Sequence, residues 1–165
     1  MMATDELKPL LLRKPRLTLA VAESLTSGHV QAAIGAVSGA SEYFLGGVTA
    51  YSLDAKVRLL GVNRAHAQRV NCVSQRVAVE MAQGACKRFK ADLALATTGY
   101  AEPSPAAGIA EPMAWWALCH VRRGGRAEII SGQVTMPGAT RGQAQERVAH
   151  EVLRQLATYL REYRQ

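Results

Sequence analysis

Residues 20–30, AVAESLTSGHV, change from an apolar run to small polar residues and then to helix formers. The apolar run predicts a buried strand that ends at Ala22, and residues 26–37 predict a helix. The polar residues between them allow two interpretations. Either Ser24 or Thr26 caps the helix, or Ser24 is a nucleophile at the mouth of a site. Glu23 either accepts backbone hydrogen bonds in this turn or lies in solvent.

The alternation of strands and helices continues along the chain. Further helices are expected at residues 5–14, 53–60 and 74–90 and from Arg141 almost to the end, and strands at 17–22, 46–52, 92–97, 115–121 and 127–134. The last two strands flank a glycine turn and predict an antiparallel hairpin. Residues 100–112 contain three prolines and predict a loop. This order predicts an α/β fold: a three-layer sandwich in which helices cover a mixed, mostly parallel sheet, with a C-terminal hairpin and a long last helix.

Composition and charge narrow the class of protein. With 165 residues, 48% of them hydrophobic, the chain predicts a single domain over residues 1–165. No apolar run reaches the roughly 18 residues of a membrane span, and residues 1–16 do not resemble a signal peptide, so no membrane partner is expected. Three widely spaced cysteines argue against a disulfide framework and favour a cytoplasmic location.

The net charge of +7 raises the question of a nucleic-acid partner. The basic residues are spread along the sequence, which disfavours that partner. The one tight group, residues 122–126, is expected to be a solvated hairpin turn rather than a polyanion contact.

Three polar turns follow predicted strands: Glu23-Ser24, Tyr51-Ser52 and Thr98-Gly99. Ligands in such sheets usually bind at the carboxyl ends of the parallel strands, so we expect these turns to converge. The helix after Ser24 begins with unpaired amides that favour negative charge. An attacking Ser24 oxygen would therefore have an oxyanion stabiliser beside it.

A serine nucleophile needs a base, and Lys56 is the best candidate. It lies one turn into the helix that follows Tyr51-Ser52, and apolar neighbours there would lower its pKa. A neutral Lys56 would then take the serine proton, while Tyr51 would relay a proton or orient the amine. The alternative is an exposed helix lysine. The histidines are expected to be structural or solvated, and no metal-binding motif is present, so neither a metal nor another cofactor is expected.

Taken together, these motifs resemble the CinA C-terminal domain family, the nicotinamide-nucleotide amidohydrolases. Residues 22–28, AESLTSG, are similar to the family's AESCTGG, and residues 51–56, YSLDAK, to its YSNEAK. The strand that ends in Thr98-Gly99 and the Met136-Pro137-Gly138 segment with Arg141 also match the family's pattern. The resemblance covers nearly the whole chain from about Thr18.

The resemblance implies hydrolysis of the carboxamide of nicotinamide mononucleotide, or of a related pyridine nucleotide, to the acid and ammonia. It implies Ser24 as nucleophile, Lys56 as base and Tyr51 as an assisting group, without a metal. Residues expected near the substrate are those of the two glycine-containing turns and two charged side chains, with Arg141 as the phosphate ligand: Thr26, Ser27, Gly28, Thr98, Gly99, Glu102 and Arg141.

The sequence departs from the family pattern around the expected substrate. Leu25 and Ser27 replace a cysteine and a glycine, Glu102 replaces a glycine near the ligand, and Trp115 stands where the family has a threonine. These changes motivate a second hypothesis, a paralogue that has lost or changed this activity and acts as a nucleotide-binding or regulatory protein. Trp116 and the apolar hairpin also favour a homodimer as the assembly.

Overall fold

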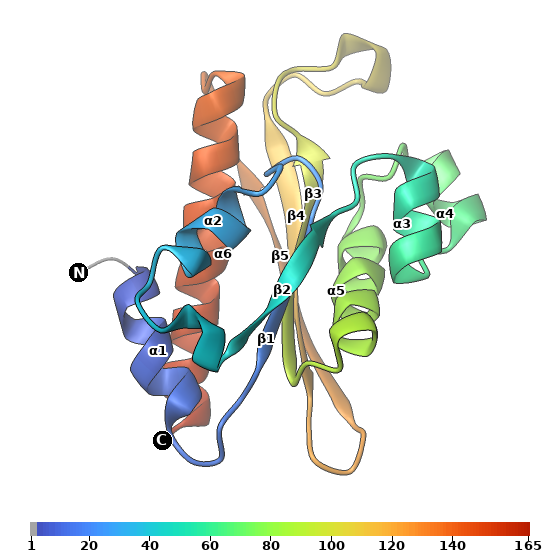
Figure 1. Ribbon diagram of the computed structural model, residues 1–165. Coiled ribbons are helices and arrows are strands. Elements are labelled where there is room, and N and C mark those ends of the chain that lie inside the picture. The colour runs from blue at the N-terminus through green and yellow to red at the C-terminus, as the bar shows by residue number, and fades with distance from the viewer. Residues whose placement is uncertain (1–2) are drawn as a thin grey trace.

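The computed structural model describes residues 3–165, which form one mixed sheet between two layers of helices (Figure 1). The strands are β1 (Leu19–Glu23), β2 (Phe44–Thr49), β3 (Leu93–Tyr100), β4 (Met113–Val121) and β5 (Ala127–Thr135), in the order β2-β1-β3-β4-β5. The strand β1 pairs in parallel with β2 and β3, whereas β3–β4 and β4–β5 are antiparallel. The predicted three-layer α/β architecture with a C-terminal hairpin is confirmed.

The helices are α1 (Ala3–Leu12), α2 (His29–Gly35), α3 (Leu53–Leu60), α4 (Arg64–Arg69), α5 (Gln75–Phe89) and α6 (Arg141–Tyr163), with short 3₁₀ turns at Ala40–Glu42 and Pro105–Ala107. Helices α1, α2 and α6 cover one face of the sheet, and α3, α4 and α5 lie on the other (Figure 1). Among these described residues, no helix has the combined length and apolarity that a membrane crossing requires.

Alternation along the central strands divides the core into two different halves. Leu19, Val21 and Leu95 point toward α6, whereas Ala20, Ala22 and Ala96 point toward α5. Small side chains on the second face let α5 pack close to the sheet, as expected for a strand buried on both sides. Gly84 of α5 extends this close packing, because a Cβ there would lie 2.0 Å from the carbonyl oxygen of Leu60 in α3. The helix α3, which carries Lys56, therefore packs directly against α5.

Several boundaries differ from the sequence prediction. The helix expected at 26–37 is shorter, because residues 24–28 form turns, and α4 was not predicted. The strand expected to end at Thr97 continues to Tyr100, because Thr98 and Gly99 pair with Trp115 and Ala114 of β4. Thr98-Gly99 is therefore part of a strand and not a turn, which corrects the third of the three expected turns.

The adjacent tryptophans lie on opposite faces of β4. Trp116 is only 5% exposed and belongs to the core under α6, while Trp115 packs partly buried against the α5 side. Because Trp116 is buried in the core of its own chain, it provides no surface for a homodimer contact. A homodimer therefore stays a prediction, without support from this side chain. The expected hairpin turn at 122–126 is confirmed by two backbone hydrogen bonds, from the Arg122 amide to the Arg126 carbonyl oxygen and from the Gly125 amide to the Arg122 carbonyl oxygen.

A small third apolar cluster joins the loops at one end of the sheet. It combines residues from the turn after β1, the loop after β3, the strand β4, the segment before α6 and α6 itself: Leu25, Ala101, Ala114, Met136, Ala139, Ala144 and Val148. In Figure 1 this is the upper end, where the turn after β1, the loop before α3 and the start of α6 all lie. Burial of these residues holds the segments that flank Ser24, Glu102 and Arg141 in contact.

Candidate active site

Ser24 and Lys56, 32 residues apart in sequence, meet at the carboxyl end of β1. The Nζ atom of Lys56 lies 2.8 Å from the Oγ atom of Ser24. Lys56 is 1% exposed and Ser24 is 7% exposed, so the pair is almost completely shielded from solvent. The alternative of an exposed helix lysine is therefore wrong.

The start of α3 explains why Lys56 reaches Ser24. The Ser52 hydroxyl caps this helix by accepting a hydrogen bond from the Ala55 amide, and Lys56 follows within the first turn. Side chains on a helix point back toward its N-terminus, so the Lys56 amine turns toward the end of β2. There it donates to the carbonyl oxygens of Ala50 and Tyr51, each at 2.9 Å.

Burial lowers the pKa of the Lys56 ammonium, and the nearby Cys72 opposes this shift. All three hydrogen-bond partners of the amine among residues 3–165 are uncharged groups. A neutral amine has two N–H donors and one lone pair. The two carbonyl oxygens can accept only N–H donors, whereas the Ser24 hydroxyl accepts from the ammonium form and can donate its proton to the lone pair of the neutral amine. The geometry therefore suits an amine that accepts a proton from Ser24.

Glu23 supplies the cap of the helix that follows the nucleophile. Its carboxylate is fully buried and accepts hydrogen bonds from the amides of Gly28, Val30 and Gln31 at 2.9, 3.1 and 2.9 Å. The interpretation that Glu23 accepts backbone hydrogen bonds is confirmed. Capping by Ser24 or Thr26 is wrong, because Gly28 occupies the N-cap position without a side-chain cap.

This arrangement also corrects the expected oxyanion stabiliser. Glu23 already provides the negative charge that the start of α2 favours, so the Gly28 amide is not available to a substrate. Ser27 donates its amide to the Ser24 carbonyl oxygen at 3.1 Å. Within residues 3–165, the amides of Leu25 and Thr26 donate to no protein acceptor. These two amides directly follow Ser24 and are the better candidates to bind a developing oxyanion.

Replacing Glu23 by Ala is expected to lower the free energy of unfolding by about 2–4 kcal/mol, because three helix amides lose a buried charged acceptor. Chemical denaturation monitored by circular dichroism measures this change. Glu23→Gln, which retains one acceptor oxygen, should fall between wild type and Glu23→Ala.

The matched control is Glu42→Ala. Glu42 forms an ion pair with Lys8 on the surface, at 3.0 Å, so its loss should cost less than about 1 kcal/mol. Equal effects of Glu23→Ala and Glu42→Ala would contradict the capping role of Glu23.

Threonines from two strand ends pack beside the nucleophile. The Thr26 and Thr97 hydroxyls lie 2.7 Å apart, and both residues are fully buried. The Thr98 hydroxyl donates to the Cys72 carbonyl oxygen at 2.6 Å. Gly99 allows β3 and β4 to approach, since a Cβ there would lie 2.3 Å from the Met113 carbonyl oxygen. These contacts support the strand ends around Ser24, and a direct ligand contact by Thr26, Thr98 or Gly99 stays a prediction.

The remaining predicted residues form a second, more exposed group. Arg141, the first residue of α6, donates to the Tyr51 hydroxyl at 2.7 Å and to the Glu102 carboxylate at 3.0 Å. Tyr51 is 53% exposed, and its hydroxyl faces Arg141 rather than Lys56 or Ser24. A proton relay through this hydroxyl therefore has no geometric support. Tyr51 positions the amine through its backbone carbonyl oxygen instead.

Three histidines hydrogen-bond to groups other than the nucleophile. The partners of His29, His66 and His120 are the Thr26 carbonyl oxygen, the Ser74 hydroxyl and the Tyr159 hydroxyl. This agrees with the expectation that these side chains are structural.

Sequence reasoning missed four contributors to the site: the Ala50 carbonyl oxygen, Thr97, Cys72 and Gln145. The Gln145 side chain donates to the Leu25 carbonyl oxygen at 2.9 Å and so connects α6 with the nucleophile turn. Backbone acceptors carry no residue signature, and the other three residues depend on which loops meet. A polar residue one turn into α6 was the only available signal, and it was too general to identify Gln145.

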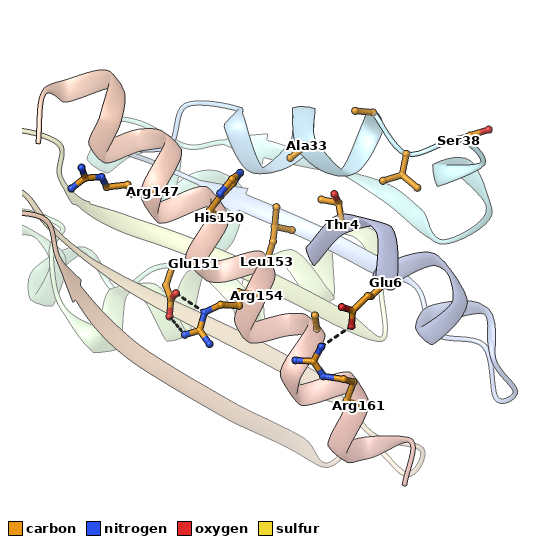
Figure 2. A pocket seen from close by; sticks show the side chains of 13 residues that line it. Thr4, Glu6, Ala33, Ser38, Arg147, His150, Glu151, Leu153, Arg154 and Arg161 are labelled. Carbon is orange, nitrogen blue, oxygen red and sulfur yellow. Dashed lines mark hydrogen bonds and ion pairs between the residues drawn. The ribbon is translucent and has the colours of Figure 1, made fainter. Parts of the chain in front are cut away.

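A cavity of the structure lies away from Ser24. It has a volume of about 830 Å³, and its walls come from α1, α2 and α6 (Figure 2). Two ion pairs, Glu151–Arg154 and Glu6–Arg161, lie along it (Figure 2). None of the predicted site residues lines this cavity. The candidate active site is therefore defined by its hydrogen bonds and burial, not by this cavity.

Comparison with known proteins identifies the family of this chain. The profile of the CinA C-terminal domain matches residues 4–160. The chain belongs to the CinA C-terminal domain family. A CinA-like protein from Chlorobium limicola is 40% identical over 156 residues, which cover 92% of this chain and 35% of that protein. A CinA-like protein from Picosynechococcus is 50% identical over 93 residues, 56% of this chain and 22% of that protein.

Solved structures of the CinA family show the same fold. The crystal structure of a CinA superfamily protein from Enterobacter cloacae superposes with a TM-score of 0.85 at 29% identity, covering 96% of this chain and 90% of that one. A competence or damage-inducible protein from Enterobacter asburiae gives a TM-score of 0.83 at 28% identity, with 96% of both chains covered. This CinA domain spans about a third or less of the length of the curated relatives it matches.

Proposed function

We propose that this CinA domain is an amidohydrolase that deamidates the carboxamide of nicotinamide mononucleotide, or of a related pyridine nucleotide, through an acyl-enzyme on Ser24. The observation that carries the proposal is the buried 2.8 Å contact between the Lys56 amine and the Ser24 hydroxyl. A nucleophile within hydrogen-bond reach of a base whose pKa is lowered is the arrangement that acyl transfer requires. The carboxamide substrate comes from the family resemblance.

In the acylation step, the Ser24 oxygen attacks the carboxamide carbon while Lys56 accepts the serine proton. The carbonyl oxygen becomes an oxyanion, which the Leu25 and Thr26 amides would stabilise. The tetrahedral intermediate then breaks its C–N bond. Lys56 returns its proton to the departing nitrogen, so that ammonia leaves and Ser24 carries the nicotinoyl group as an ester.

Deacylation repeats these steps with water as the nucleophile. Lys56, neutral again, takes a proton from water, and the hydroxide attacks the ester carbon. The ester C–O bond breaks, and Lys56 returns the proton to the Ser24 oxygen. The product is nicotinate mononucleotide. The carbonyl oxygens of Ala50 and Tyr51 keep the amine in place throughout both half-reactions.

An ammonia-release assay with purified protein tests this function. Nicotinamide mononucleotide should yield ammonia and the acid in equal amounts, and a panel of pyridine carboxamides defines the substrate. Tight binding of pyridine nucleotides without any release of ammonia would instead support the binding or regulatory paralogue. Absence of both binding and release across the panel would reject the pyridine-nucleotide assignment.

The value of kcat/KM is expected to rise with pH, because only the neutral Lys56 amine accepts the Ser24 proton. Burial lowers the pKa of Lys56, so the ascending limb should have its midpoint below the ordinary lysine value of about 10.4. Rates measured between about pH 6 and pH 9.5 check this expectation, with circular dichroism confirming that the fold persists. A profile that falls over this range would contradict a neutral lysine base.

A further inference from the structure

An ion pair lies at the outer side of the candidate active site. Arg141 and Glu102 contact each other at 3.0 Å, with side chains that are 46% and 62% exposed. The second guanidinium nitrogen, Nη2, binds the Tyr51 hydroxyl at 2.7 Å. Both terminal nitrogens of Arg141 are thus already engaged by groups of this chain.

Two connections fix this ion pair relative to the nucleophile. Tyr51 binds Arg141 through its hydroxyl and Lys56 through its carbonyl oxygen, at 2.9 Å, so one residue bridges the two groups. In addition, Leu25, Ala101 and Ala139 belong to one apolar cluster. Leu25 follows Ser24, Ala101 precedes Glu102, and Ala139 lies just before α6. These connections place Arg141 one residue, Tyr51, away from the Lys56 amine, and the family resemblance implies that Arg141 binds the substrate phosphate.

The charges in this group favour some substrates over others. A phosphate monoester binds well to a guanidinium, with two parallel hydrogen bonds. Here the Glu102 carboxylate already holds one nitrogen of Arg141 and would also repel a phosphate. A phosphate that binds Arg141 therefore competes with Glu102 for the guanidinium charge, whereas a ligand without phosphate leaves the ion pair intact.

We propose that Glu102 is a specificity-determining residue that competes with substrate phosphate for Arg141 and so lowers the preference of the site for phosphorylated over unphosphorylated pyridine carboxamides. The proposal deepens the proposed function and rests on it for the class of ligand. A pyridine nucleoside carboxamide binds while the Arg141–Glu102 ion pair stays intact. Glu102 weakens the binding of the corresponding nucleotide, which carries a phosphate.

Binding measurements separate this specificity from catalysis. Calorimetric titrations would use the Ser24→Ala protein, which keeps the carboxamide intact, with nicotinamide mononucleotide and nicotinamide riboside as the two ligands. Adding Glu102→Gln should tighten binding of the mononucleotide about three- to fivefold, the upper part of the range for one exposed charge pair, and change binding of the riboside less than about twofold. The gain should disappear when Arg141→Gln is also present.

The matched control is Glu146→Gln, which removes the same charge from an exposed position of α6. It should change the ratio of the two affinities less than about twofold, because the position is exposed and its charge is screened. A similar ratio change in both variants would indicate a general charge effect and overturn the proposal.

Other outcomes also overturn it. Equal loss of affinity for both ligands in Glu102→Gln would place the carboxylate against the pyridinium ring, which the two ligands share. An unchanged ratio, a gain that persists without Arg141, or no binding of either ligand would each reject competition for the guanidinium.

The two proposals can fail separately. Ammonia release that requires Ser24, combined with an unchanged affinity ratio in Glu102→Gln, would retain the hydrolase and reject the role of Glu102. The predicted ratio change, combined with no ammonia release from the intact protein, would retain the role of Glu102 and reject the hydrolase.

Discussion

Ser24→Ala is expected to lower kcat/KM for ammonia release by at least about 10³-fold, because no other group at this position can form the acyl-enzyme. The hydroxyl contacts the Lys56 amine at 2.8 Å and lies beside two amides that donate to no described protein acceptor. Removing one oxygen deletes the nucleophile and leaves the surrounding backbone intact. Steady-state ammonia release, with mass spectrometry of the intact protein to detect a nicotinoyl adduct, measures the loss.

The control for this prediction is Ser41→Ala, which changes an exposed serine in the 3₁₀ turn before β2. Its rate should stay within about twofold of wild type, as expected for an exposed substitution away from the site. If Ser24→Ala retained ammonia release at the wild-type rate, Ser24 would be excluded as the nucleophile and the acyl-enzyme mechanism would be abandoned.

Lys56→Met is expected to lower kcat/KM by at least about 10³-fold, because the methionine side chain has similar length and no amine. Ser24 then keeps its proton, and the leaving nitrogen receives none. The same ammonia-release assay measures the effect. Lys87→Met, which removes an exposed lysine from α5, should leave the rate within about twofold of wild type. Comparable losses in the two variants would contradict a specific role for Lys56.

Stability provides a second readout for Lys56 that does not depend on substrate. Burial lowers the pKa of Lys56 in the folded state, so above that value the unfolded chain binds one proton more than the folded chain. The free energy of unfolding of the wild type, relative to Lys56→Met, should therefore rise with pH between the lowered pKa and about 10.4. Denaturation at several alkaline pH values tests this. A constant difference between the two proteins would mean that the Lys56 pKa is not lowered.

The fold was largely predictable from local patterns. The helix at 53–60, the start of the last helix at Arg141 and the hairpin around residues 122–126 agree with the structure, because periodicity, capping residues and glycine turns act over a few residues. The errors occur where contacts between residues distant in sequence determine the bounds of a helix or strand. The strand β3 extends to Tyr100 because β4 pairs with Thr98 and Gly99, and no local signal in 92–100 requires this.

The candidate site, like the fold, was predictable from the sequence only in part. The residue types after β1 and β2, together with the family resemblance, were enough to select Ser24 and Lys56. The sequence could not decide how Glu23, Tyr51 and Glu102 act, since each has several possible partners. In the structure, Glu23 caps α2, the Tyr51 carbonyl oxygen holds the amine, and Glu102 pairs with Arg141 from 39 residues away.

By itself the sequence determined the α/β order of elements, the resemblance to CinA domains and the two residues proposed for catalysis. Only the tertiary structure decided that the amine lies buried against the hydroxyl, and that the outer cation is already paired with a carboxylate. The physical reason is that strand and helix formation depend on neighbouring residues. Burial, pKa and charge pairing depend instead on which distant loops the sheet brings together.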